Sequence, residues 1–220
     1  METAINVTLA GDRPASLADR AMAPFTSSSL CDESAMAAAI ERALRPRQPL
    51  PRHWLFTDER LGDRLLHAVG RLPEGSGIVF RHYGLDEPER RRLFDEIRAV
   101  ADDRSLLLLL AGPAGQARDW GADGSHGRGR GAGLRSAPAH DYVELRAAER
   151  NGAELVFLSP VFATRSHPGS KGMGVARFAW LARRSRLPVI ALGGMDPERG
   201  RRLASFGAYG WAAIDAWTRA

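Results

Sequence analysis

The sequence predicts an α/β fold, a compact (β/α)8 barrel of the TIM type, and three observations lead to it. From His53 onward, eight short apolar segments of strand length follow one another, most of them followed by an amphipathic, helix-like segment. Ser105–Leu110 is continuously apolar, which is typical of a strand buried on both faces. Strand–helix alternation produces a parallel sheet with right-handed crossovers, and eight repeats favour a closed barrel over the alternative, a doubly wound open sheet.

The first four strands and two helices are expected between Trp54 and His126. Phe94 and Ile97 belong to an apolar stripe at helical spacing, and Pro88 suits a first helical turn. The expected strands are Trp54–Thr57, Gly77–Arg81, Ser105–Leu110 and Ala122–His126. The expected helices are Leu61–Leu72 and Glu87–Ala101.

The second half of the pattern carries clearer helix boundaries. Gly152 suits the end of one helix, and Asp196 followed by Pro197 suits the N-cap and first turn of another, which ends near Gly207. The helix that Gly152 ends is expected over Asp141–Asn151, and a third helix is expected over Val175–Ser185. The expected strands are Leu134–Ser136, Glu154–Ser159, Leu187–Leu192 and Tyr209–Ile214.

Residues 1–50 differ from the rest of the chain. The first 29 are rich in Ala, Ser, Thr and Pro without a clear period, which is typical of a loosely ordered segment. Glu33–Leu44 has apolar residues at four-residue spacing and predicts one short helix, which Pro46 and Pro49 end. We therefore expect a poorly ordered tail and linker over residues 1–50 and the barrel over residues 51–220.

Composition excludes several classes of protein. The longest apolar run, Leu106–Ala111, is far shorter than the roughly 20 residues of a membrane helix, so no membrane partner is expected. Charged pairs such as Asp12-Arg13 interrupt the N-terminus, and no signal peptide is predicted. A single cysteine, Cys31, cannot form an internal disulfide, and a cytoplasmic location fits best. Nothing in the sequence predicts the oligomeric state.

The chain is basic, with a net charge of +5, and Lys171 is its only lysine. A basic chain raises nucleic-acid binding as a possibility. The arginines, however, are spread along the chain and alternate with acids, as in Glu87-Pro-Glu-Arg-Arg-Arg92. We therefore expect no nucleic-acid partner.

In a barrel of this kind the active site lies on the loops after the strands. Gly193-Gly194 lets backbone N–H groups approach a ligand ahead of a helix N-terminus, an arrangement that favours phosphate. The loop after Glu154–Ser159 adds donors suited to oxyanions, namely Thr164, Arg165, Ser166, His167 and Lys171. Together they predict a small phosphorylated ligand. The loop histidines lack close ligand spacing, so no histidine metal site is predicted.

Motifs in a fixed order resemble the thiamine-phosphate synthase family, which includes the thiazole tautomerases. The two most specific are Ser159-Pro-Val-Phe-Ala-Thr164 and Ala191-Leu-Gly-Gly194. The others are Leu55-Phe-Thr-Asp58, Val79-Phe-Arg81, Gly121-Ala-Asp-Gly-Ser-His126 and Gly207-Ala-Tyr-Gly-Trp-Ala-Ala-Ile214. The resemblance covers about residues 53–217 and implies a compact eight-stranded α/β barrel.

The resemblance also implies a reaction, in which hydroxymethylpyrimidine diphosphate is joined to thiazole phosphate and pyrophosphate leaves with the help of Mg2+. Arg81 resembles the arginine that holds the diphosphate, and Ser136 the serine near the pyrimidine–diphosphate junction. The residues resembling the donors to the thiazole phosphate are Thr164, Ser166, Gly194, Ala213 and Ile214. Gly193 and Arg165 adjoin them as candidate binding residues.

The sequence departs from the family at the expected metal site. The family's two magnesium aspartates have no counterpart in Leu110-Ala-Gly-Pro113 or between His126 and Leu134. Tyr83 and His167 stand where the family has lysines. Either arginines such as Arg128, Arg130 and Arg165 substitute for the metal, or the diphosphate chemistry has been lost.

Three functions remain open from the sequence. The first is a divergent thiamine-phosphate synthase. The second is an isomerase of the tautomerase type with His126, His140 or His167 as the proton carrier, although Pro160 stands near the position of the tautomerases' own histidine. The third is a non-catalytic binder of a phosphorylated ligand.

Overall fold

The computed structural model describes residues 49–131, 133–164 and 171–218. Contacts divide the chain into units Met1–Arg45 and Pro46–Ala220, and the described residues all belong to the second. The tail and short helix predicted over residues 1–50 lie almost entirely outside the described residues. No helix in the described ranges is long and apolar enough to cross a membrane.

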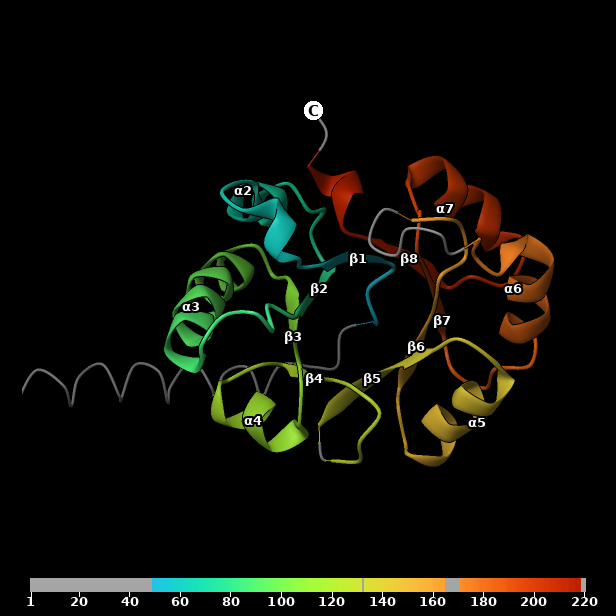
Figure 1. Ribbon diagram of the computed structural model, residues 1–220, viewed down its shortest axis with the longest axis horizontal. Coiled ribbons are helices and arrows are strands. Elements are labelled where there is room, and N and C mark those ends of the chain that lie inside the picture. The colour runs from blue at the N-terminus through green and yellow to red at the C-terminus, as the bar shows by residue number, and fades with distance from the viewer. Residues whose placement is uncertain (1–48, 132, 165–170, 219–220) are drawn as a thin grey trace, which may run out of the picture. The chain divides into compact units, whose positions relative to one another are not determined.

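Eight parallel strands form a closed barrel, as predicted, in which each strand pairs with the next along the chain (Figure 1). The last strand closes the barrel on the first, with Trp54 opposite Ala212. The strands are β1 (His53–Phe56), β2 (Gly77–Phe80), β3 (Leu107–Ala111), β4 (Gly124–His126), β5 (Leu134–Ala139), β6 (Leu155–Leu158), β7 (Val189–Leu192) and β8 (Gly210–Ala213). The open-sheet alternative is therefore wrong.

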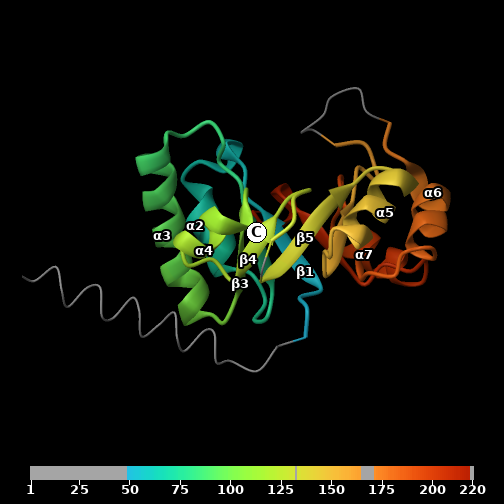
Figure 2. The ribbon, with the colours of Figure 1, turned by 90° about the horizontal axis from the view of Figure 1, so that it is seen from below.

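Helices lie around the barrel, with α2, α3 and α4 on one side and α5, α6 and α7 on the other (Figures 1 and 2). Their bounds are α2 (Arg64–Gly70), α3 (Glu87–Asp103), α4 (Ala114–Asp119), α5 (Tyr142–Arg150), α6 (Gly174–Ala182) and α7 (Pro197–Ala204). Two 3-10 turns follow β1 and β8, namely η1 (Glu59–Leu61) and η2 (Asp215–Trp217). Asp86, Asp141 and Asp196 cap their helices by accepting the N–H of the residue three positions on.

The main differences between the predicted and the observed elements lie at η1 and α2, at α4 and at β5. The helix expected over Leu61–Leu72 is divided at Gly62, whose φ of 47° ends η1 before α2 begins. The short helix α4 was not predicted, because six residues are too few to show a helical period. Strand β5 continues past Ser136 to Ala139, although Pro138 weakened its strand pattern.

The barrel interior is filled by alternate strand residues, with Phe157 among the aromatic rings. Phe157 meets the rings of Trp54 and Phe56 edge-on, at centroid distances of 5.3 and 4.8 Å. A Cβ on Gly77 would lie 2.2 Å from the Trp54 ring, so β2 begins with the residue that leaves room for the indole. This packing places a rigid apolar floor beneath the carboxyl ends of the strands.

Candidate active site

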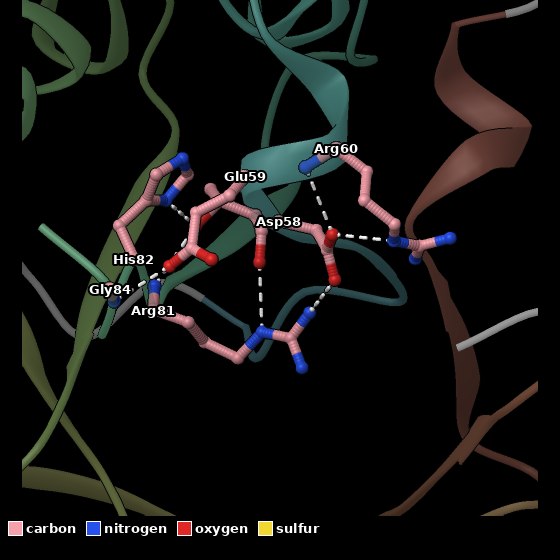
Figure 3. Close-up of polar contacts among 7 residues, drawn as sticks. Asp58, Glu59, Arg60, Arg81, His82 and Gly84 are labelled. Carbon is pink, nitrogen blue, oxygen red and sulfur yellow. Dashed lines mark hydrogen bonds and ion pairs between the residues drawn. The ribbon is translucent and has the colours of Figure 1, made fainter. Parts of the chain in front are cut away.

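Arg81 follows β2 and is held from the neighbouring end of β1 (Figure 3). Its Nε donates to the carbonyl oxygen of Thr57 at 2.8 Å, and its Nη2 donates to Oδ2 of Asp58 at 2.9 Å. Its backbone N–H donates to Oγ1 of Thr57 at 2.9 Å. Nη1 has no hydrogen-bond partner in the described part of the chain, and the side chain is 26% exposed. One edge of the guanidinium is therefore available to an anionic ligand.

Asp58 binds a second arginine as well. Its Oδ1 accepts from Nε of Arg60 at 2.7 Å and from the backbone N–H of Arg60 at 3.1 Å. Burial raises the pKa of the Asp58 carboxyl, but the hydrogen bonds from Arg60 and the charge of Arg81 outweigh it, and the pKa lies below its ordinary value. Asp58 is therefore ionised at neutral pH and fixes the guanidinium of Arg81.

The residue after Arg81, His82, has a backbone φ of 44°, a left-handed conformation that is strained for a histidine. Its buried ring stacks on Phe80 at a centroid distance of 5.1 Å, and its Nδ1 lies 3.0 Å from Oγ1 of Thr57. Burial is the main cause that lowers the pKa of His82, so the imidazole is neutral. Glu59 supports the same turn by accepting the N–H of Gly84 at 2.8 Å.

His126 and Ser136 form a second polar group, at opposed positions on β4 and β5. Nδ1 of His126 lies 2.9 Å from Oγ of Ser136, and the imidazole meets Phe56 and Phe157 edge-on at 5.3 Å. Ser136 is 1% exposed, so its hydroxyl orients the imidazole from within the barrel wall. Although His126 as a residue is only half-buried, burial of its ring, with a smaller effect of Arg81, lowers its pKa to about 3.

We expect His126 to make the fold sensitive to acid. In the unfolded chain the imidazole takes up a proton near its ordinary pKa of 6.5, whereas in the folded protein it does so only near pH 3. The unfolded state thus binds more protons as the pH falls below 6.5, and the free energy of unfolding decreases towards pH 3. Denaturant unfolding at pH 7.0 and 4.5 checks this: the wild type should lose more stability between these pH values than His126→Gln. His67→Gln, at an exposed histidine of α2, is the control, and an equal loss in the wild type and His126→Gln would contradict the expectation.

The Gly193-Gly194 turn follows β7 with φ values of 96° and 62°, which favour glycine. A Cβ on Gly193 would lie 2.7 Å from Cα of Pro160, and one on Gly194 would lie 2.6 Å from the carbonyl oxygen of Ala163. The loop after β6 hydrogen-bonds along this turn, with the N–H of Phe162 donating to the carbonyl oxygen of Gly193 at 3.1 Å. Only residues without a Cβ permit this close approach of the two loops.

The structure brings some predicted residues together and not others. Leu192 pairs with Ala212, so the glycine turn is level with Ala213, the last residue of β8, and with Ile214, which follows it. Thr164 is partly buried at the end of the described loop. The predicted site residues Arg165, Ser166 and His167 lie outside the described residues.

The two arginines after β4 contact α5. Nη1 of Arg128 donates to Oε1 of Glu144 at 2.6 Å, and Nε of Arg130 donates to Oδ1 of Asn151 at 3.2 Å. Nearby, Nδ1 of His140 donates to the carbonyl oxygen of Ser159 at 2.6 Å, which leaves Nε2 as the acceptor nitrogen of a neutral ring. Arg128 therefore has a partner on α5, and Arg130 has one at the C-cap of that helix.

The described residues do not fit a magnesium site of the kind the resemblance implies. Gly112-Pro113 after β3 and the described residues after β4 offer no carboxylate, the ligand that Mg2+ requires from protein. Asp58 is at this end of the barrel, but each of its oxygens already accepts from an arginine. No group of three or more His, Cys, Asp or Glu residues suited to a metal is found within the ranges described.

Sequence reasoning gave no role to Thr57 and Asp58, although both belong to a motif it singled out. Their roles depend on a contact between the ends of two neighbouring strands, which no local pattern reveals. Their position directly after an apolar strand was the available signal.

A family model and sequence relatives indicate one family, and solved structures show a similar fold. The family model described as thiamine monophosphate synthase matches residues 54–217. A relative from Aquifex aeolicus, named "Putative thiamine-phosphate synthase 2", is 30% identical over 179 residues, which cover 75% of this chain and 96% of the relative. Thiamine-phosphate synthase from Methylococcus capsulatus is 28% identical over 188 residues, covering 76% and 83% of the two chains. Thiamine phosphate pyrophosphorylase from Pyrococcus furiosus has a similar fold, with a TM-score of 0.66 at 21% identity over 78% of this chain and 88% of that one.

Proposed function

The chain belongs to the thiamine monophosphate synthase family, and we propose that it joins hydroxymethylpyrimidine diphosphate to thiazole phosphate. In this reaction the bond between the pyrimidine methylene carbon and the diphosphate oxygen breaks, and pyrophosphate leaves with the electron pair. The thiazole nitrogen then forms the new carbon–nitrogen bond. The observation that carries the proposal is Arg81, whose guanidinium is fixed by Thr57 and Asp58 with one edge available to an anion.

Different residues bind the two phosphorylated substrates in this proposal. Arg81 stabilises the negative charge that grows on the departing diphosphate, and a donor fixed in advance does so without reorganisation. The backbone of Gly193 and Gly194, with Ala213 and Ile214 beside it, holds the thiazole phosphate, together with Thr164 and Ser166. Ser136 orients the neutral imidazole of His126, which borders the pyrimidine end of the site.

The resemblance implies Mg2+ as a cofactor, and when bound the ion would neutralise diphosphate charge. The described donor set does not fit such an ion. Of the arginines considered as substitutes, Arg128 and Arg130 are engaged by Glu144 and Asn151. We therefore propose that Arg81 binds and neutralises the diphosphate. Arg165 and His167, in the loop after β6, are further candidates for this role. A cytoplasmic location is proposed from the single cysteine, Cys31, and from the chemistry of the small phosphorylated substrates.

The test is an assay for thiamine phosphate with both substrates, run once with Mg2+ and once with EDTA. We expect product in both conditions, and reactions that omit either substrate are the controls. Product only with Mg2+ would support the proposed reaction and overturn the assignment of the diphosphate charge to protein side chains without a metal. No product in either condition would overturn the proposed reaction. Tight binding of thiamine phosphate in that case would indicate a non-catalytic binder.

One observation favours a second candidate, an isomerase acting on a thiazole phosphate. His140 donates from Nδ1 to the carbonyl oxygen of Ser159, which leaves Nε2 as the ring nitrogen that would exchange a proton with a substrate. His126 does not suit this role, because its pKa of about 3 keeps it neutral across physiological pH. Isomerisation of a thiazole phosphate by the wild type, lost in His140→Asn, would support this candidate, and a rate that is flat between about pH 5 and 8 would count against it.

A further inference from the structure

Arg90 is a buried arginine of α3 whose hydrogen bonds go to the ends of two strands. Its Nε donates to the carbonyl oxygen of Arg81 at 2.8 Å, and its Nη2 donates to the carbonyl oxygen of Ala111 at 2.9 Å. The side chain belongs to a residue only 9% exposed, and its guanidinium lies 5.2–5.6 Å from the rings of Phe80, Tyr83 and Trp120. One side chain thus connects the carboxyl ends of β2 and β3.

A contribution to stability alone does not explain why the charged side chain of Arg90 is buried. Removing a charged group from water is costly, and apolar residues of similar size often stabilise a core as well as a buried charge does. The hydrogen bonds to two backbone carbonyls and the contacts with three aromatic rings offset part of that cost. A role in placing the neighbouring chain explains the residue better than a role in stability.

The chain that Arg90 places is the one that carries the candidate anion donor. The carbonyl of Arg81 is bound by Arg90, its N–H by Oγ1 of Thr57, and its guanidinium by Thr57 and Asp58. The next residue, His82, has the left-handed φ of 44°, and such a conformation is strained and persists only where its surroundings hold it. Without the Arg90 contact, the backbone after β2 would be free to relax and carry Arg81 with it.

We infer that Arg90 is a positioning residue for the diphosphate site, which fixes the backbone of Arg81 so that its guanidinium meets the substrate in one orientation. This inference rests on the proposed function, since it assigns Arg81 to the diphosphate. Arg90 itself does not contact the substrate in this scheme. Arg90 therefore affects the binding and departure of the diphosphate and does not affect the binding of thiazole phosphate.

Arg98 provides a matched control on the same helix. It is also 9% exposed, and it pairs with Asp123 at 2.7 Å and with Asp102 at 2.9 Å. Asp123 also accepts the N–H of Leu108, so Arg98 supports the amino ends of β3 and β4. Loss of Arg98 therefore disturbs the fold at the opposite end of the barrel from Arg81.

The experiment compares Arg90→Gln, Arg90→Lys and Arg98→Gln with the wild type. For each we would measure the melting temperature, kcat, the KM for both substrates, and the affinity for inorganic pyrophosphate. We expect Arg90→Gln to lower kcat/KM for the diphosphate substrate by about 10- to 100-fold and to weaken pyrophosphate binding, with the KM for thiazole phosphate unchanged. Arg90→Lys should recover part of the loss, because an ammonium can still donate to a carbonyl. Arg98→Gln should lower the melting temperature without changing either KM.

The outcomes separate the two proposals. If the wild type neither forms thiamine phosphate nor binds pyrophosphate, the proposed function fails and the role of Arg90 fails with it. If the wild type does both and Arg90→Gln behaves like Arg98→Gln, only the positioning role is overturned. Should Arg90→Gln fail to fold, Arg90→Lys decides, since it keeps the charge: wild-type kinetics and pyrophosphate affinity in that variant would overturn the inference.

Discussion

Replacement of Arg81 by glutamine is expected to lower kcat/KM for the diphosphate substrate by about 10²–10³-fold, the usual effect of removing one fixed donor to a developing anion. Glutamine is shorter and neutral, so it cannot reach Thr57 and Asp58 while presenting charge to a ligand. The measurement is steady-state kinetics with each substrate varied in turn. The KM for thiazole phosphate should change little, because that substrate is assigned to the loops after β6, β7 and β8.

Two further variants test whether the loss of activity is caused by the guanidinium of Arg81. Arg91→Gln removes an exposed arginine of α3 that pairs with Asp95 on the surface, and it should leave the kinetics unchanged. Arg81→Lys keeps the charge but not the planar donor geometry, and it should recover only part of the activity. Wild-type kinetics in Arg81→Gln would remove Arg81 from the site.

Replacement of Phe157 by alanine should have the largest effect on stability, lowering the free energy of unfolding by about 3–5 kcal/mol. The ring is fully buried in the barrel interior, and it contacts the rings of Trp54, Phe56 and His126. The cavity left behind cannot close easily, because its walls are strands of a closed barrel. Thermal unfolding should show a decrease in melting temperature on the order of 10 °C.

Val143→Ala is the control for this measurement. Val143 is 71% exposed on α5, so its loss should change the free energy of unfolding by no more than about 0.5 kcal/mol. A decrease in Phe157→Ala as small as that in Val143→Ala would mean that the interior repacks around the missing ring.

Much of the fold was predictable because a parallel barrel repeats one simple pattern. Eight apolar segments marked the strands, and Asp196 followed by Pro197 marked the start of α7 correctly. The break at Gly62 was missed, since Leu61 and Leu65 continue one apolar stripe across it. A stripe reports which side chains are buried and not whether the backbone between them turns.

The candidate site was harder to predict, as Arg90 illustrates. In the sequence it stands first of three consecutive arginines and gives the impression of a solvated, charged face. It lies four residues before Phe94, however, and so falls on the buried stripe of α3. The same spacing argument that identified the apolar face would have singled it out among its neighbours.

The direction in which loop arginines point could not be predicted either. Arg128 and Arg130 were candidates to substitute for the missing metal ligands, as one of two alternatives, because they follow a strand at the correct end of the barrel. Their partners, Glu144 and Asn151, lie on and just after α5 and become neighbours only once the barrel has closed. The position of a residue in the sequence predicts the end of the barrel at which it lies. It does not predict the partner of a long side chain, because residues of several loops come within its reach in the folded barrel.

The pairing of β8 with β1 has a consequence for synthesis on the ribosome. The first strand emerges long before the strand that closes the barrel on it, and until then the growing sheet has two open edges. Those edges consist of apolar segments with unpaired backbone groups, which makes incomplete chains prone to aggregation. We therefore expect nascent chains that end before Gly210 to associate with chaperones. This association should end once β8 has emerged from the ribosome and paired with β1.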